Sequence, residues 1–186
     1  MKRLFTFAAP LAAVLVMTAC TSPAAKETSR VNGLDSAFTS EADITLGKLD
    51  THAAVTRSGS GVWTAEFSSP DTLSGVKLEF TEGSVKASYK GLEMSVPQAA
   101  LPVKSMMLCL IEAVDSNATA EELTGKENGK YLDISGKLDG GEYVLTVDEN
   151  GMLHSFTMEN NSLEITFSPR CPCLCGSACF YWGKPF

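Results

Sequence analysis

The sequence predicts a mainly β fold of the α+β class, an antiparallel meander that curves into an incompletely closed barrel around one main helix. Apolar residues alternate with polar ones through most of residues 34–168, which is the period of strands that bury one face. Dipeptides that favour tight turns separate the alternating runs. A single interruption, residues 97–126, has the period of a helix instead. These three observations define the fold class.

The alternating runs are expected to be strands. Residues on their buried faces are Ile44, Ala65, Leu78, Ala87, Met94, Leu132, Leu145, Phe156 and Ile165. The turn dipeptides tolerate a positive φ and are Glu82-Gly83, Lys90-Gly91, Gly140-Gly141, Asn150-Gly151 and Asn160-Asn161. Because consecutive strands are joined this tightly, they must be antiparallel neighbours.

The helix is predicted from about residue 104 to residue 114, with Pro102 just before it, where a missing N–H costs nothing. Its apolar residues recur at i, i+3, i+4 and i+7, and are Met107, Leu110, Ile111 and Val114. Single helical turns are also expected at residues 34–38 and 118–123.

The dimensions of these elements decide the architecture. About ten strands at ~4.8 Å spacing form a sheet roughly 48 Å wide. One helix of about twelve residues is ~18 Å long and ~10 Å across, so it cannot cover a flat sheet of that width. The sheet must therefore curl around the helix or leave apolar surface for another molecule to fill.

Residues 1–19 have the layout of a secretion signal. Lys2 and Arg3 give a positive start, and a short apolar run follows that is poorly suited to span a membrane. The next residue, Cys20, follows Met17-Thr18-Ala19 and resembles the acceptor cysteine of the bacterial lipobox, whose thiol takes a diacylglyceryl group. Met17 stands where that motif usually has leucine. The alternative is a plain secreted chain in which Cys20 is incidental.

The expected organisation is a lipoprotein signal peptide at 1–19, lipidated Cys20 with a tether to residue 33, a folded domain at 34–168 and a tail at 169–186. Two or more acyl chains anchor a protein durably, so the chain is expected on the extracytoplasmic face of the cell membrane. The sequence has 15 basic and 22 acidic residues, and losing two basic residues with the signal leaves 13 and a net charge near −9. Such a surface disfavours nucleic acid and a basic membrane-binding patch.

The motif Trp63-Thr64-Ala65-Glu66-Phe67-Ser68-Ser69-Pro70, followed by Leu73 and Gly75, precedes Tyr89-Lys90-Gly91-Leu92-Glu93 and the late meander. With these motifs, residues 38–167 resemble the LolA/LppX-like bacterial lipoprotein superfamily, including small clostridial germination-lipoprotein-like proteins. The resemblance implies an unclosed half-barrel with helices in its concave face. It also implies a binding function, either of acyl chains in that face or of a protein partner, with no catalytic signature.

If the concave face is hollow, its expected lining is Trp63, Phe67, Phe80, Met94, Met107, Leu110, Ile111 and Phe156. Methionines adapt to irregular apolar shapes, so a lipid groove and simple core filling are both open for Met94, Met106, Met107, Met152 and Met158. Tyr131 is expected in strand packing. His154 alternates with Phe156 and Met158 and is expected in the core or at its rim.

Two functions are predicted. The first is a non-catalytic, lipid-anchored interaction or scaffold module for an envelope protein partner, with the barrel filled by its own helix. The alternative is the binding of a hydrophobic ligand such as an acyl chain or lipid. A cavity between sheet and helix would favour the alternative. No enzyme activity and no cofactor are expected, because the chain has neither G-x-S-x-G nor H-E-x-x-H.

The tail concentrates four cysteines, Cys171, Cys173, Cys175 and Cys179. Their density suits thiolate metal binding, but the spacing lacks the C-x2-C pairs of structural zinc sites and the tail has no histidine. Disulfides are the alternative in an oxidising exterior. A third reading is an unselected, disordered tail, because composition shifts abruptly after the last strand, and this reading is ranked first.

Overall fold

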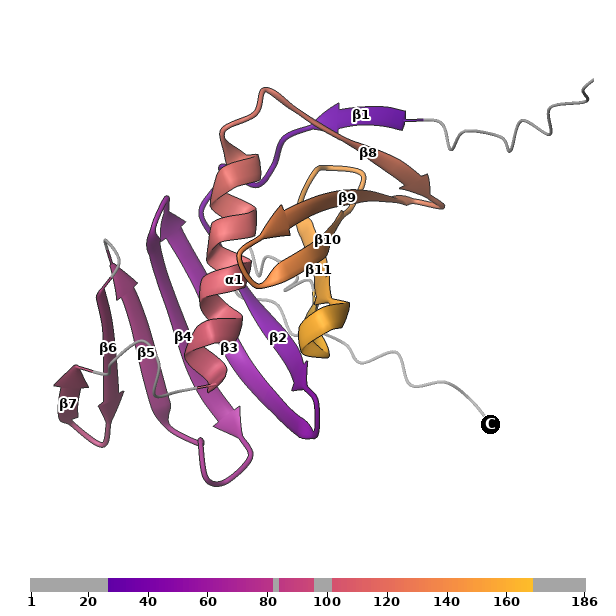
Figure 1. Cartoon of the computed structure of the whole chain (residues 1–186). Helices are drawn as coiled ribbons and strands as arrows, with labels where there is room; N and C mark the ends of the chain where they lie inside the picture. The colour runs from indigo at the N-terminus through magenta and orange to yellow at the C-terminus, as the bar shows by residue number, and fades with distance from the viewer. Residues whose placement is uncertain (1–26, 82–83, 96–101, 169–186) are drawn as a thin grey trace, which may run out of the picture.

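The computed structural model describes residues 27–81, 84–95 and 102–168, in which one open antiparallel sheet curves around one α-helix (Figure 1). The helix α1 is Pro102–Ala118, and a short 3-10 helix, η1, is Glu159–Asn161. The strands are β1 (Glu27–Val31), β2 (Phe38–Leu46), β3 (Leu49–Gly59), β4 (Val62–Ser69), β5 (Val76–Thr81), β6 (Ser84–Tyr89), β7 (Leu92–Ser95), β8 (Glu122–Asn128), β9 (Tyr131–Leu138), β10 (Gly141–Val147), β11 (Leu153–Met158) and β12 (Leu163–Ser168). The predicted fold class, an unclosed half-barrel with one main helix, is confirmed.

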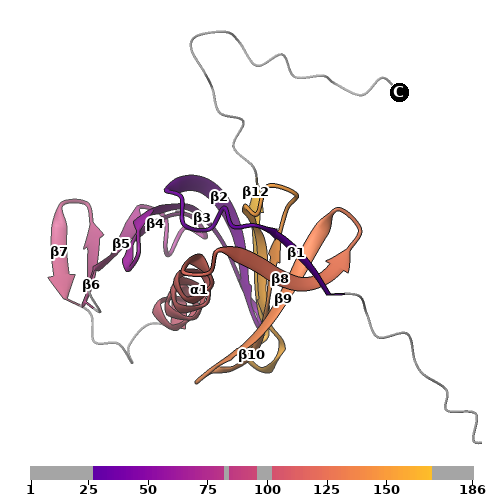
Figure 2. The ribbon, with the colours of Figure 1, turned by 90° about the horizontal axis from the view of Figure 1, so that it is seen from above.

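The sheet order is β1-β8-β9-β10-β11-β12-β2-β3-β4-β5-β6-β7. The chain therefore starts at one edge, continues from the centre to the other edge, and returns through α1, which lies in the concave face (Figure 2). The last five strands then run back to the centre, where β12 pairs with β2. The turns from β6 to β7, from β9 to β10 and from β10 to β11 were predicted, whereas the turns at Gly47, Gly61 and Gly129 were not. The joins of β12 to β2 and of β1 to β8 were not predictable, because they connect segments far apart in sequence.

Three strands lie where the sequence predicted none. Glu27–Val31, expected to belong to the tether, is β1 and pairs with β8. No side chain of β1 is fully buried, and only Leu123 of β8 is, so neither strand shows a clear alternation. In β3 the buried positions include Thr51 and Arg57, whose polarity hides the period.

The two predicted single helical turns are wrong. In residues 34–38 the chain makes a turn and Phe38 begins β2. In residues 118–123 Ala118 ends α1, which is longer than predicted, and Glu122 begins β8. Both segments are turns that lead into a strand, because Phe38 and Glu122 find their backbone partners in neighbouring strands.

The turn chemistry predicted between β6 and β7 is confirmed, since Lys90 and Gly91 have φ of 49° and 83°. Asn160 and Asn161 instead lie in η1, and Ser162 takes the left-handed conformation after them. Glu82-Gly83 lies outside the described residues.

The hydrophobic core lies between α1 and the concave sheet face. Its largest fully buried side chains include Trp63, Phe67, Phe156, Met107 and Leu110. The predicted helical stripe is buried as a unit, with Met107, Leu110 and Val114 at 0 % exposure. No helix in the described part of the chain is long and apolar enough to cross a membrane.

An ion pair between a buried arginine and a part-buried aspartate, whose side chain is 14 % exposed, joins α1 to the sheet. Arg57 of β3 is 3 % exposed, and its Nη2 and Nε lie 3.0 and 3.1 Å from Oδ1 of Asp115 on α1. The other carboxylate oxygen of Asp115 accepts hydrogen bonds from the Gly61 N–H (2.7 Å) and the Trp63 indole N–H (3.3 Å). The Arg57 guanidinium also donates to the Asp35 carbonyl (2.8 Å). Because each charge has several partners, this pair specifies where the helix sits.

Candidate functional site

The side chains predicted to line a cavity mostly fill the concave face. Seven of the eight are 8 % exposed or less: Trp63, Phe67, Phe80, Met107, Leu110, Ile111 and Phe156. The eighth, Met94, lies on β7 and is 59 % exposed. Cys20 and the four tail cysteines lie outside the described residues. The structure therefore brings the seven buried residues together as packed core and leaves Met94 at the sheet edge.

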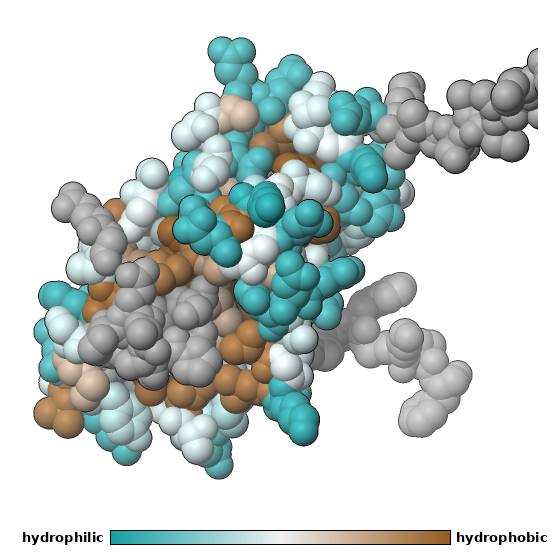
Figure 3. Space-filling view, viewed as in Figure 1, coloured by the Kyte–Doolittle hydropathy of each residue, from teal (hydrophilic) through white to brown (hydrophobic). Residues whose placement is uncertain are grey.

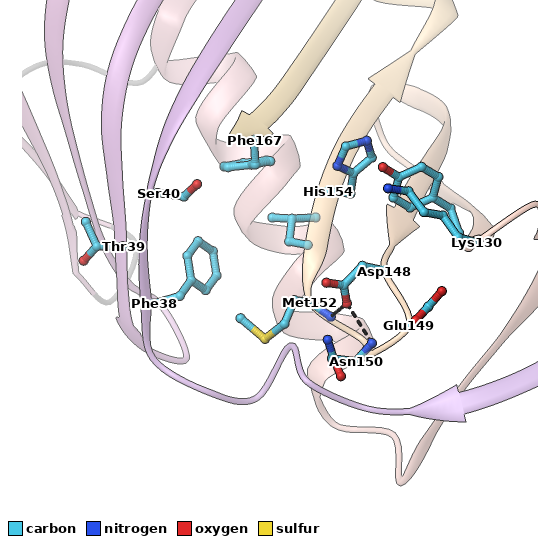
Figure 4. Close-up of a pocket in the computed structure, with 12 residues that line it drawn as sticks. Phe38, Thr39, Ser40, Lys130, Asp148, Glu149, Asn150, Met152, His154 and Phe167 are labelled. Atoms are coloured by element: carbon cyan, nitrogen blue, oxygen red, sulfur yellow. Dashed lines mark hydrogen bonds between the residues drawn. The ribbon is translucent and has the colours of Figure 1, made fainter. Parts of the chain in front are cut away.

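A pocket of about 610 Å³ lies elsewhere, between the start of β2 and the turn that joins β10 to β11 (Figure 4). Its lining residues are Phe38, Thr39, Ser40, Lys130, Tyr131, Asp148, Glu149, Asn150, Met152, Leu153, His154 and Phe167. Two shallower hollows lie around Tyr143 and around Ala54. The pocket beside β2 is the candidate site because it reaches the aromatic core.

The start of β2 forms one side of the pocket. The last residue of β12 in the described chain, Ser168, pairs with Glu41, so residues 38–40 of β2 extend beyond it. The Ser40 hydroxyl donates a hydrogen bond to the Ser168 carbonyl (2.6 Å) and closes the ladder there. The pocket lies between these residues of β2 and the β10–β11 turn.

One half of the pocket is apolar. The Phe38 ring packs edge-on against Phe167, with centroids 6.3 Å apart, and against Trp63 at 5.6 Å. Such perpendicular ring pairs are a favourable aromatic geometry. Met152 and Leu153 add aliphatic surface. This half of the pocket is therefore a direct extension of the core, and it offers a surface for an apolar group.

The other half is polar and aromatic. The rings of Tyr131 and His154 are stacked with centroids 4.2 Å apart and an angle of 8° between planes. The Lys130 ammonium lies 5.0 Å from the centroid of the Tyr131 ring, within cation–π range. Glu149 is exposed at the same side. This half can orient the polar end of a ligand by hydrogen bonds and charge.

The turn beneath the pocket is held by its own hydrogen bonds. Asp148 Oδ1 accepts from the N–H groups of Asn150 (2.8 Å) and Met152 (3.0 Å), shown as dashed lines in Figure 4. Gly151 in this turn has φ +72°, and its backbone lies close to Val31 at the end of β1 and to Gly33 just after it. A side chain at position 151 would overlap the Val31 carbonyl oxygen. The turn and the segment after β1 therefore pack backbone to backbone.

Polar groups elsewhere form ordinary side-chain contacts. His52 lies between Asp43 (2.7 Å) and Glu41 (3.3 Å) on the side of the sheet away from α1. Hydrogen bonding to Glu79, together with its charge, raises the pKa of Lys77, and the same contact lowers the pKa of Glu79. Within the described residues no group of three or more His, Cys, Asp or Glu side chains is arranged to hold a metal ion.

Sequence reasoning named three of the pocket residues without placing them in one site. Met152 was considered for a groove, Tyr131 for strand packing, and His154 for the core or its rim. Phe38 and Phe167, which form the apolar half, were not proposed as site residues. Their meeting depends on the pairing of β12 with β2, so no local pattern could have revealed it.

No family model and no curated protein matches the sequence. Among solved structures, an uncharacterized conserved protein from Thermus thermophilus is similar with a TM-score of 0.45 and 13% identity, over 72% of this chain and 77% of the other. A LolA superfamily protein from Nitrosomonas europaea is similar with a TM-score of 0.32 and 9% identity, over 72% and 69%. Both TM-scores are too low to identify a family. The fold and site define a half-barrel with a pocket at one end, and the resemblance seen in the motifs stays a prediction.

Proposed function

We propose that this chain is a binding module that holds an amphipathic molecule in the pocket between β2 and the β10–β11 turn. The observation that carries the proposal is the pocket itself, about 610 Å³ with one apolar and one polar half. Ligand sites typically measure roughly 300–1,000 Å³ and combine apolar walls with a few polar groups. A ligand with one acyl or aromatic group and a polar end has the matching chemistry.

Burial supplies the affinity in this proposal. Each methylene placed against Phe38, Phe167 and Met152 contributes about 0.8 kcal/mol of binding free energy. A chain of several methylenes therefore offsets part of the free-energy cost of association. Met152 adapts to ligands of different shape because its thioether is flexible. Lys130 and His154 set the direction of the polar end.

The ligand site of this proposal differs from the one expected in the concave face. There, seven of the predicted lining side chains are packed against one another, which leaves them no free surface for a ligand. The pocket between β2 and the β10–β11 turn has both the volume and the apolar surface.

The interaction module predicted first is the second candidate function. Leu92 is 67 % and Met94 59 % exposed on β7, the strand at one edge of the sheet. In Figure 3 apolar residues reach the surface at the lower left, where Figure 1 places β7. An edge strand with exposed apolar side chains is a common docking element, and this observation supports a protein partner.

Membrane attachment through Cys20 is part of the proposal. Cys20→Ser should leave an unprocessed precursor that does not label with a palmitate analogue in the bacterial host. Labelling of the variant at the native level would contradict acylation at this residue.

The ligand proposal is tested by titrating the purified full chain with dansyl-labelled undecanoic acid and following its fluorescence. Met152→Trp fills the pocket and should weaken binding by at least about tenfold, equal to 1.4 kcal/mol. The matched control is Met94→Trp, the same change at an exposed site on β7, and it should bind like the native chain. Equal binding by all three proteins, or no binding by the native chain, would overturn the proposal.

A further inference from the structure

β1 contacts the polar half of the pocket through one side chain. Arg30 donates hydrogen bonds from Nη1 to the Lys130 carbonyl (2.7 Å) and from Nη2 to the Tyr131 carbonyl (3.2 Å). Both acceptors belong to residues that line the pocket. The contact joins positions 100 residues apart in sequence, so it is a tertiary contact and not a turn.

The hairpin that carries these carbonyls is held on both sides up to its tip. β9 pairs with β10 from Leu132 onward, and β8 pairs with β1 up to Lys126. The tip lies beyond these pairs, where Asn128 pairs with Tyr131 and Lys130 is exposed. The planar fork of an arginine fixes two acceptors at once, so Arg30 ties the hairpin tip to β1.

The position of Tyr131 matters because its ring is stacked on His154 at 4.2 Å. A small shift of the hairpin would separate the two rings and widen the pocket. We propose that Arg30 is a positioning residue: through it, β1 holds the Tyr131–His154 wall in place and thereby sets the affinity of the pocket. This inference rests on the proposed function of the pocket.

β1 is suited to this role because it adds little to the core. None of its side chains is fully buried, and Val31 is 75 % exposed. Removing the Arg30 guanidinium should therefore loosen the wall without unfolding the half-barrel. β1 also lies within the segment predicted to be the tether, so the segment that would attach the chain to a membrane also positions the pocket wall.

The chain has two histidines, which gives a direct readout by NMR of the imidazole signals. His154 reports on the stack with Tyr131, whose ring current shifts its signals, and His52 on the far side of the sheet is an internal control. In the full chain, Arg30→Met should move the His154 signals toward those of an unstacked histidine and leave His52 unchanged. The same variant should weaken binding of dansyl-labelled undecanoic acid by about fivefold or more, the lower end of typical coupling between sites.

Two further variants make the test specific. Arg30→Lys can reach one carbonyl only and should give intermediate values. Lys126→Met removes a positive charge from β8, opposite Glu27, and should change neither measurement. If Arg30→Met leaves the His154 signals at their native positions and the affinity within twofold of the native chain, the positioning role is wrong while the proposed function stands. If the native chain binds no probe, the proposed function is wrong, and the His154 signals still decide whether Arg30 positions the wall.

Discussion

The concave face under α1 and the pocket beside β2 are built from the same kind of alternating strand, yet one is filled and the other is open. Under the helix, Trp63, Phe67 and Leu110 are 1 % exposed or less. At the pocket, Phe38, Met152 and Leu153 are only half-buried. The difference arises because α1 covers the first region, whereas the second begins where β12 ends in the described chain.

The two regions also use polar groups differently. Asp115 and Arg57 satisfy each other and nearby N–H and carbonyl groups inside the protein. Lys130 and Glu149 stand exposed at the rim of the pocket. Satisfied, buried polar groups fix a structure, whereas exposed ones remain available to a ligand. Stability is therefore expected to reside under α1 and binding in the pocket.

The largest loss of unfolding free energy is expected when the ion pair between Arg57 and Asp115 is broken. Asp115→Ala leaves the Arg57 charge and the indole N–H of Trp63 without their partner, so unfolding free energy should fall by about 3–5 kcal/mol. The measurement is chemical denaturation of the full chain. Asp43→Ala is the control, since it removes an exposed pair with His52 and should cost less than about 1 kcal/mol. Equal losses in the two variants would mean that the buried pair does not fix the helix.

The next largest loss of unfolding free energy is expected when the packing of α1 is weakened. Leu110 is 0 % exposed, and Leu110→Ala should cost about 2–5 kcal/mol of unfolding free energy, because the deleted methyl groups leave a cavity. Leu92→Ala on β7 makes the same change at a 67 % exposed site and should stay within roughly 0.5 kcal/mol of the native chain. A loss below about 1 kcal/mol for Leu110→Ala would show that α1 is peripheral.

A smaller effect is expected at the pocket end. Gly151→Ala must strain a φ of +72° and push against the Val31 carbonyl, so we expect a loss of about 1–3 kcal/mol. Gly91 has a φ of +83° but open space around it. Gly91→Ala therefore introduces the backbone strain without an overlap and should lower the unfolding free energy by less than Gly151→Ala. If both variants lose the same stability, the backbone contact between the turn and the segment after β1 has no energetic weight.

The smallest effect concerns reactivity and not stability. Burial, with a lesser contribution from the charge of Glu112, raises the pKa of the Cys109 thiol. Because the thiolate is the reactive form, iodoacetamide at pH 8 should modify Cys109 more slowly than free cysteine, and the rate should rise with pH. Peptide mass spectrometry measures the rate, and urea should bring it to that of free cysteine. A rate in the native chain equal to that in urea would place Cys109 in open solvent.

Much of the fold was predictable because its cause is local. The alternation at Ala65 and Phe67 and the helical stripe at Leu110 follow from the period of each element. Strands whose buried positions are polar or only partly covered were missed, as in β3 with Arg57 and in β1. At those positions burial is balanced by tertiary hydrogen bonds, which composition and period do not report.

By itself the sequence determined which segments are most clearly amphipathic, where some of the hairpins turn, and that one helix had to lie inside a curved sheet. Only the tertiary structure decided where that sheet is filled and where it is open. Ser40 bonds to Ser168 across 128 positions of sequence, and Arg30 reaches Lys130 across 100. The pocket exists because such distant segments meet, which is a property of strand pairing and not of any local pattern.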